Sequence, residues 1–183
     1  MGLDLPFKRK MACWALLAVL AADVPGAAAA ALPPDPLPVV ALSAGAAEIF
    51  DHDTFFCASI EWRPAFRVLR HLGPDFVVGT GRHGEMCAAV GVFCDIPIGS
   101  SLLLTPSFDA GYYNSADEGR DLGFDLEFRS AVQFCWRFDS GYRIGVTFDH
   151  LSNGSLADRN PGTEALTLTF VCPLCRGCPS SAP

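Results

Sequence analysis

The sequence has few charged residues, an excess of acidic over basic side chains, and no apolar stretch of membrane-helix length after its first thirty residues. Charged residues make up 18% of the 183 residues, and 13 Lys and Arg stand against 20 Asp and Glu. Nucleic-acid binding needs clustered basic side chains that displace counterions, so a net charge of −7 argues against a nucleic-acid partner. Half of the residues are apolar, which is too many for a disordered chain. We therefore expect one folded domain.

The N-terminal residues have the order of a secretory signal peptide. Lys8, Arg9 and Lys10 precede an apolar run from Met11 to Ala22, and a run of small residues follows. This apolar run is shorter than the roughly 20 residues that a membrane-spanning helix needs, so we expect the segment to be removed and not kept as an anchor. The sequence therefore predicts an exported protein.

Beyond the prolines that follow this segment, a period of two residues dominates. Between Leu126 and Phe138 one face carries large apolar side chains, whereas the other carries Glu127, Arg129 and Gln133. Such alternation predicts β-strands with one apolar and one polar face. The predicted strands are Val39–Phe50, Thr54–Arg63, Asp75–Arg82, Glu85–Ile96, Leu102–Tyr113, Leu126–Phe138, Tyr142–Ser152 and Thr163–Val171.

The composition of the polar face decides between two architectures. A soluble barrel hides its apolar face, whereas a transmembrane barrel turns that face to lipid and fills its narrow lumen with polar side chains. Here the polar faces combine ionic and small residues, and aromatic residues at strand ends fit interfacial girdles. We therefore predict an all-β fold, an eight-stranded antiparallel up-and-down transmembrane β-barrel, with a soluble lipid-binding barrel as the alternative. The predicted divisions are a signal peptide (1–30), a Pro-rich leader (31–38), an outer-membrane barrel (39–171) and a Cys-containing tail (172–183).

Polar residues interrupt the apolar face where the seventh predicted strand ends. His150 and Ser152 share this face, and Glu164 lies on the outward face of the next strand. Unpaired polar groups that face hydrocarbon are costly, so their convergence favours a function. A serine becomes a nucleophile when an imidazole takes its proton, and a carboxylate orients that imidazole. The three residues are thus a candidate catalytic triad, and Asn153 or Asn160 is the candidate donor to an oxyanion.

Five short segments around these residues form a recognisable pattern. They are Leu126–Ser130, Arg137–Phe138, Gly141–Arg143, Phe148–Asn153 and Asn160–Glu164. In this order and spacing they closely resemble the outer-membrane lipid A 3-O-deacylase family, most strongly between about Tyr112 and Phe170.

The resemblance implies an eight-stranded barrel whose serine esterase site faces the outer leaflet and removes the acyl chain that is ester-linked at position 3 of lipid A. Position by position, it implies Ser152 as nucleophile, His150 as general base, Glu164 as the acid that orients the base, and Asn160 as the oxyanion donor. Lipopolysaccharide is then the expected substrate and the bacterial outer membrane the expected location, and the sequence leaves open a homodimer.

Other features leave alternatives open. A non-catalytic outer-membrane barrel, an adhesin or a structural protein, is the second functional hypothesis. The pattern of His, Ser and a distant Glu is not a familiar zinc-ligand set, so we expect no metal and no cofactor. Cys172, Cys175 and Cys178 form a C-x2-C-x2-C pattern in the tail, for which a disulfide with a spare thiol and a metal site are both open.

Overall fold

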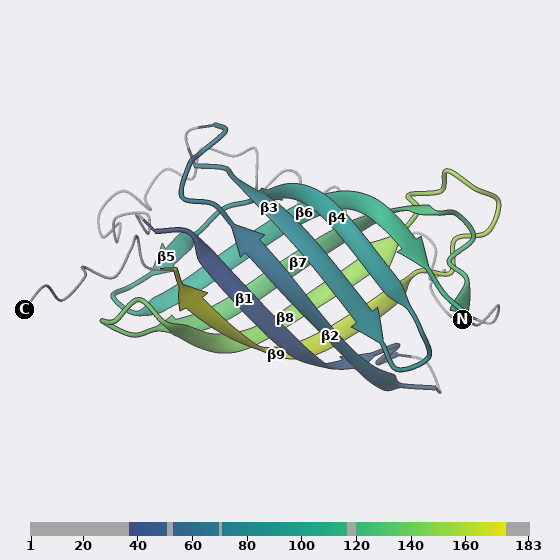
Figure 1. The fold of residues 1–183 in the computed structure, drawn as a ribbon, viewed down its shortest axis with the longest axis horizontal. Coiled ribbons are helices and arrows are strands. Elements are labelled where there is room, and N and C mark those ends of the chain that lie inside the picture. The colour runs from purple at the N-terminus through teal and green to yellow at the C-terminus, as the bar shows by residue number, and fades with distance from the viewer. Residues whose placement is uncertain (1–36, 51–52, 70, 117–119, 175–183) are drawn as a thin grey trace, which may run out of the picture.

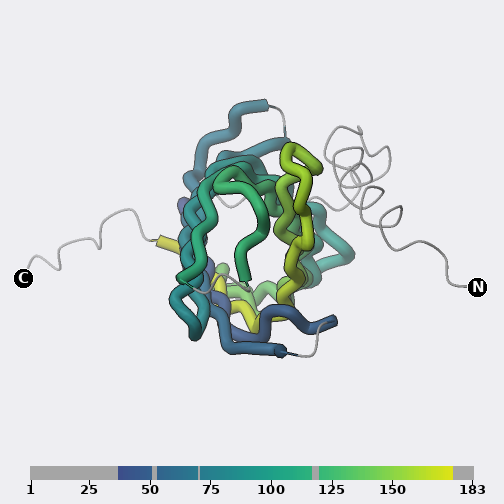
Figure 2. Tube along the Cα trace, turned by 90° about the vertical axis from the view of Figure 1, so that its right-hand side faces the viewer, coloured from purple at the N-terminus to yellow at the C-terminus, as the bar shows by residue number. Residues whose placement is uncertain are grey.

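The computed structural model describes residues 37–50, 53–69, 71–116 and 120–174, and its β-strands form one antiparallel sheet that closes on itself (Figure 1). The strands are β1 (Val39–Ala47), β2 (Phe55–Arg63), β3 (Gly73–Gly81), β4 (Met86–Phe93), β5 (Ile96–Ile98), β6 (Leu102–Asn114), β7 (Leu126–Arg137), β8 (Arg143–Ser152) and β9 (Thr163–Pro173). Consecutive strands pair in the up-and-down order, β1 pairs with β9, and β4 pairs with β6. Figure 2 shows the resulting ring along its axis.

The nine elements make an eight-stranded barrel because β4 and β5 are two parts of one strand. Both pair with β6, and the register is the same on either side of the gap, with Phe93 opposite Ser107 and Ile96 opposite Leu104. Pro106 lies opposite the gap and has no N–H to donate, although its carbonyl oxygen still accepts from the backbone N–H of Cys94 at 3.1 Å. The predicted eight-stranded fold is thus confirmed. Its fourth strand is divided into β4 and β5 where Pro106 of the neighbouring strand β6 lacks an N–H group.

The barrel begins at the predicted residue and ends two residues later than predicted. β1 begins at Val39, where the first strand was predicted, and β9 continues to Pro173, two residues past the predicted Val171. The predicted signal peptide and most of the leader lie outside the described residues, as do Cys175 and Cys178. In the part of the chain that the structure describes, no helix is long and apolar enough to cross a membrane.

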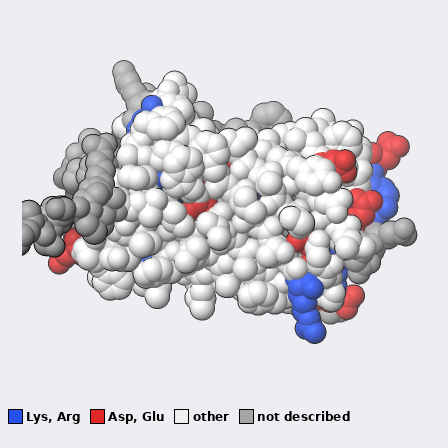
Figure 3. Space-filling model, in the orientation of Figure 1, with Lys and Arg blue, Asp and Glu red and all other residues white. Residues whose placement is uncertain are grey.

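The barrel is polar inside and apolar outside. Along β7, Glu127, Arg129 and Gln133 are buried, whereas Phe134 and Trp136 are 42% and 50% exposed. The outer surface in Figure 3 is largely uncharged between the two ends of the barrel. This arrangement is the inverse of a soluble barrel and matches a barrel surrounded by lipid, which excludes the soluble alternative.

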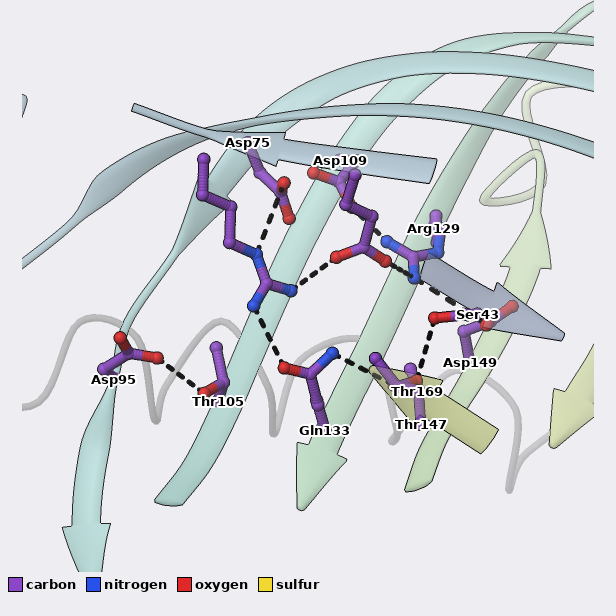
Figure 4. A network of polar contacts seen from close by, with 12 residues as sticks. Ser43, Asp75, Asp95, Thr105, Asp109, Arg129, Gln133, Thr147, Asp149 and Thr169 are labelled. Carbon is purple, nitrogen blue, oxygen red and sulfur yellow. Dashed lines mark hydrogen bonds and ion pairs between the residues drawn. The ribbon is translucent and has the colours of Figure 1, made fainter. Parts of the chain in front are cut away.

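Several buried charges of the lumen are paired, most of them across strands. Figure 4 shows the network. Arg129 contacts Glu61 of β2 and Asp109 of β6, the latter at 3.0 Å, and Arg63 contacts Glu61 and donates to Gln133 Oε1 at 3.1 Å. Because a buried charge without a partner is strongly destabilising, these contacts permit ionic residues to fill a closed lumen.

The two ends of the barrel differ. One end, which we call the loop end, carries the connections 48–54, 82–85, 115–125 and 153–162, and the opposite turn end carries 64–72, 99–101 and 138–142. At the loop end, the β6–β7 connection turns back across the mouth of the barrel (Figure 2). Its Leu122 is 3% exposed and packs with Tyr113 and Leu151, so this loop covers part of the mouth of the lumen.

Candidate active site

The three candidate triad residues lie on adjacent strands at the loop end, on the outward face of the barrel. His150 and Ser152 are on β8, where they alternate with Leu151, which packs inside the mouth. In the register, Ser130 of β7 and Glu164 of β9 lie on either side of His150. The sequence predicted both the face and this adjacency, and the structure places the residues accordingly.

The imidazole and the carboxylate are in direct contact. His150 Nδ1 lies 3.0 Å from Glu164 Oε1, the distance of a hydrogen bond. Residues directly opposite in an antiparallel pair have Cβ atoms about 4.5–5.5 Å apart, so their side chains meet without backbone distortion. A carboxylate that accepts from Nδ1–H fixes the tautomer in which Nε2 accepts a proton.

Ser152 is the neighbour of His150 on the same face. Residues i and i+2 of a strand have Cα atoms about 7 Å apart, and their side chains point the same way. Opposite Ser152, on β7, lies Phe128, whose ring stacks on that of Phe108 with the centroids 5.9 Å apart. The serine is therefore placed beside an apolar aromatic surface, which suits an acyl chain.

The three candidate residues are shielded although they lie on the outer wall. His150, Ser152 and Glu164 are 9%, 7% and 8% exposed, whereas Leu166, on the same outward face of β9, is 47% exposed. Part of this shielding comes from the β8–β9 loop at Gly162, which has a φ of 68°. A Cβ atom there would lie 3.0 Å from Cε1 of His150, so glycine permits the loop to approach the imidazole.

Gly162 was part of the family pattern, but the sequence did not predict its role. The signal that could have indicated it is its place after Pro161, since a Pro-Gly pair commonly marks a turn that requires a positive φ.

The two candidate asparagines have different surroundings. Asn153 is fully buried, and its side-chain amide donates to the carbonyl oxygens of Leu122 at 3.0 Å and Arg159 at 2.7 Å. Its Oδ1 accepts from the backbone N–H of Ser155 at 3.0 Å. Both side-chain hydrogens are thus already donated, which gives Asn153 the role of holding the loop together.

One hydrogen bond orients the side chain of Asn160 within the β8–β9 loop. Its Oδ1 accepts from the backbone N–H of Asn153 at 3.1 Å, and its side chain is half-buried. The remaining part of the group is an NH2 donor, as oxyanion binding requires. The structure therefore favours Asn160 over Asn153 as the oxyanion donor.

The β6–β7 loop packs against the β8–β9 loop, a contact that the sequence did not predict. Gly123, with a φ of 91°, is so close to Arg159 that a Cβ atom would lie 2.4 Å from the Arg159 carbonyl oxygen. Arg120 of the same β6–β7 loop contacts the β1–β2 loop. Its Nη1 lies 2.6 Å from Glu48 Oε2, and its guanidinium lies over the ring of Phe55 at the start of β2. The loops at this end therefore contact one another as one unit.

The lumen contains a separate cavity of about 90 Å³, lined by Cys57, Cys87, Arg129 and Asp149 among others. It is on the opposite side of the barrel wall from the outward triad. Among the described residues no group of three His, Cys, Asp or Glu side chains is placed to hold a metal ion.

Comparisons with known proteins concern the fold and the family of this chain. A solved structure described as the outer membrane enzyme PagL matches with a TM-score of 0.59 and 17% identity, over 74% of this chain and 99% of that one. A de novo designed transmembrane β-barrel matches with a TM-score of 0.52 and 13% identity, over 76% of this chain and 96% of the design. Neisserial surface protein A matches with a TM-score of 0.52 and 10% identity, over 75% of this chain and 97% of that one.

These structural matches show the fold, and a designed barrel among them demonstrates that the fold alone does not identify an enzyme. The comparison with curated proteins finds no match. The family and the solved barrels confirm the predicted location in the bacterial outer membrane. The family model described as "Lipid A 3-O-deacylase (PagL)" matches residues 68–173, more than half of the chain, and the chain therefore belongs to the lipid A 3-O-deacylase family, as its motifs predicted.

Proposed function

We propose that this protein is a lipid A 3-O-deacylase that works as a serine hydrolase, with Ser152 as nucleophile, His150 as general base and Glu164 as the acid that orients it. Membership of the family supports the deacylation of lipid A. The observation that carries the serine mechanism is the 3.0 Å contact between His150 Nδ1 and Glu164 Oε1, on the same outward face as Ser152. Such a pair has the arrangement that activates a serine hydroxyl.

The reaction follows from this arrangement. Ser152 Oγ attacks the carbonyl carbon of the acyl ester at position 3 while His150 Nε2 takes the hydroxyl proton. Glu164 stabilises the imidazolium that forms, and the NH2 group of Asn160 donates to the oxyanion of the tetrahedral intermediate. Collapse of this intermediate releases the sugar hydroxyl, which receives the proton from His150. Water then attacks the acyl-enzyme, with His150 as base again, and releases the fatty acid and free Ser152.

The position of the site fits the substrate. Paired charges and Leu122 occupy the lumen, and its cavity of about 90 Å³ is too small for a lipid with several acyl chains. A site on the outer wall meets lipids laterally, and at the loop end it is also within reach of water for the second step. We therefore place the loop end in the outer leaflet, where lipopolysaccharide resides.

The decisive experiment compares lipid A from cells that express the parent chain and the Ser152→Ala variant. Mass spectrometry should show the loss of one acyl chain with the parent and intact lipid A with Ser152→Ala. Ser140→Ala, an exposed position at the turn end, is the matched control and should deacylate like the parent.

Each other result is informative, provided that outer-membrane fractions contain the folded barrel. Deacylation by Ser152→Ala would contradict the nucleophile, while intact lipid A with the parent would favour the non-catalytic barrel. A homodimer stays an untested prediction, which light scattering of the purified barrel in detergent would decide.

A further inference from the structure

The connection between β2 and β3, residues 64–72, differs from the other connections of the turn end. The turns 99–101 and 138–142 extend along the barrel axis in Figure 1, whereas the 64–72 connection projects sideways from the barrel wall. The view along the axis in Figure 2 shows the same projection outside the ring. The segment therefore extends to where lipid surrounds the barrel and not away from the membrane.

This connection is held in shape by hydrogen bonds. The backbone N–H of Val68 donates to the Leu72 carbonyl oxygen at 2.8 Å, and the N–H of Leu72 donates to the Leu69 carbonyl oxygen at 3.0 Å. The Arg67 guanidinium lies 5.0 Å from the centre of the Phe93 ring of β4, which attaches the base of the segment to the barrel.

The described part of this connection, residues 64–69 and 71–72, presents apolar side chains outward. Phe66, Val68 and Leu69 are 60%, 50% and 67% exposed. A group of large apolar side chains that an ordered turn holds away from the protein indicates a surface that something covers.

Two observations indicate that phospholipid covers it. At the base of the segment, the outward-facing rings of Trp62 and Phe76 lie with their centroids 5.2 Å apart, and Trp is enriched at membrane interfaces. The sequence 64–72 contains two arginines, one histidine and no carboxylate, in a chain of net charge −7. Basic residues beside apolar ones are the combination that binds anionic lipid headgroups at an interface.

We propose that residues 64–72 are a lateral anchor in the inner leaflet of the outer membrane, with Phe66, Val68 and Leu69 among phospholipid chains and Arg67 near the phosphates. The assignment to the inner leaflet rests on the proposed function, which places the opposite end in the outer leaflet. Such an anchor fixes the depth and tilt of the barrel, and with them the height of Ser152 relative to the ester of lipid A.

Photo-crosslinking of the full chain tests this anchor. We would replace Phe66 with benzoylphenylalanine, irradiate isolated outer membranes and identify adducts by mass spectrometry. The expected product is a phospholipid adduct. The positive control carries the same probe at Leu168, which is 72% exposed on β9 in the barrel wall. It should give a lipid adduct in the same preparation.

The other outcomes overturn the proposal. An adduct of Phe66 with lipopolysaccharide would contradict the leaflet, an adduct with protein would contradict a lipid partner, and no adduct beside a positive Leu168 control would contradict membrane contact. The same crosslink should form in the Ser152→Ala background. A phospholipid adduct in a parent chain that shows no deacylation would refute the proposed function and leave the contact with phospholipid standing.

A second measurement tests the basic side chain. In vesicles of mixed phosphatidylethanolamine and phosphatidylglycerol, adducts at Phe66 should be enriched in phosphatidylglycerol above its share of the lipid. Arg67→Gln should reduce that enrichment while heat-modifiable mobility on gels shows that the barrel is still folded. Enrichment that is the same in both chains would refute the role of Arg67.

Discussion

Replacing Glu164 by Gln tests the orientation of the catalytic base, because it removes one charge and keeps the shape of the side chain. The carboxylate accepts from His150 Nδ1 at 3.0 Å, and both side chains are about 10% exposed. Two opposite charges about 4 Å apart interact by about 4 kcal/mol at an effective dielectric constant of about 20. Because each 1.36 kcal/mol corresponds to a factor of ten in rate, loss of this stabilisation predicts a fall in kcat of about 10³-fold.

The amide also disturbs the tautomer. Glutamine can donate to Nδ1 as well as accept from it, so part of the histidine would carry its proton on Nε2, where it cannot accept one from Ser152. In serine proteases, replacing the orienting carboxylate by the corresponding amide lowers kcat by about 10⁴-fold. We expect KM to change little, since Glu164 lies behind the imidazole and interacts with the substrate only through it.

The assay is the rate of fatty-acid release from purified lipopolysaccharide in detergent, with kcat and KM determined separately. Asp139→Asn, the same kind of change at an exposed position of the turn end, should have the activity of the parent. A folded Glu164→Gln barrel that loses less than tenfold in kcat would refute the role given to this carboxylate. A loss that appears only in KM would indicate a contact with substrate instead.

Three further predictions concern the loop and the lumen. Gly162→Ala puts a methyl group at a positive φ beside the His150 ring and should lower kcat at least tenfold, whereas Gly99→Ala, also at a positive φ but with no atom within 4 Å of the new Cβ, should not. Asn160→Asp keeps the oxygen that accepts from Asn153 but removes the donor, so kcat should fall by about 10²–10³-fold, and full activity would contradict the oxyanion role. Arg129→Ala leaves Glu61 and Asp109 without this partner. The free energy of unfolding, measured by urea titration of the barrel in vesicles, should fall by about 3–5 kcal/mol. An unchanged urea midpoint would refute the stabilising role of these ion pairs.

Local alternation was sufficient to predict the strands and the face on which each side chain lies. The period-two pattern from Leu126 to Phe138 corresponds to β7, with its ionic residues inside. The predicted strand Glu85–Ile96 divides into β4 and β5, because the missing N–H belongs to Pro106 on the neighbouring strand. A strand's own sequence carries no information about a donor that its partner lacks.

The arrangement of the three proposed triad residues could be predicted for the same reason, and that of the loops could not. His150, Ser152 and Glu164 are positioned by the pairing of adjacent strands, which follows from pattern and hairpin length. The contact between Arg120 and Glu48 joins two loops 72 positions apart, and no periodicity relates such residues. Residue type and position therefore left both Asn153 and Asn160 open, and only the family resemblance pointed to Asn160 before their partners were known.

The placement of the triad on the outer wall follows from the size of the barrel. An eight-stranded barrel has an interior that its own side chains nearly fill, and here Arg63, Arg129 and their carboxylates leave a cavity of only about 90 Å³. A substrate with several acyl chains can therefore be reached only from outside, where polar catalytic groups face hydrocarbon and are costly unless paired. The His150–Glu164 contact and the loop that approaches the imidazole at Gly162 reduce that cost, since both shield the groups from lipid. Because such a site moves with the whole barrel, its reach to an ester at a fixed depth depends on how the barrel sits in the membrane. A lateral anchor at the opposite end, through Phe66 and its neighbours, is then part of what determines which ester the serine meets.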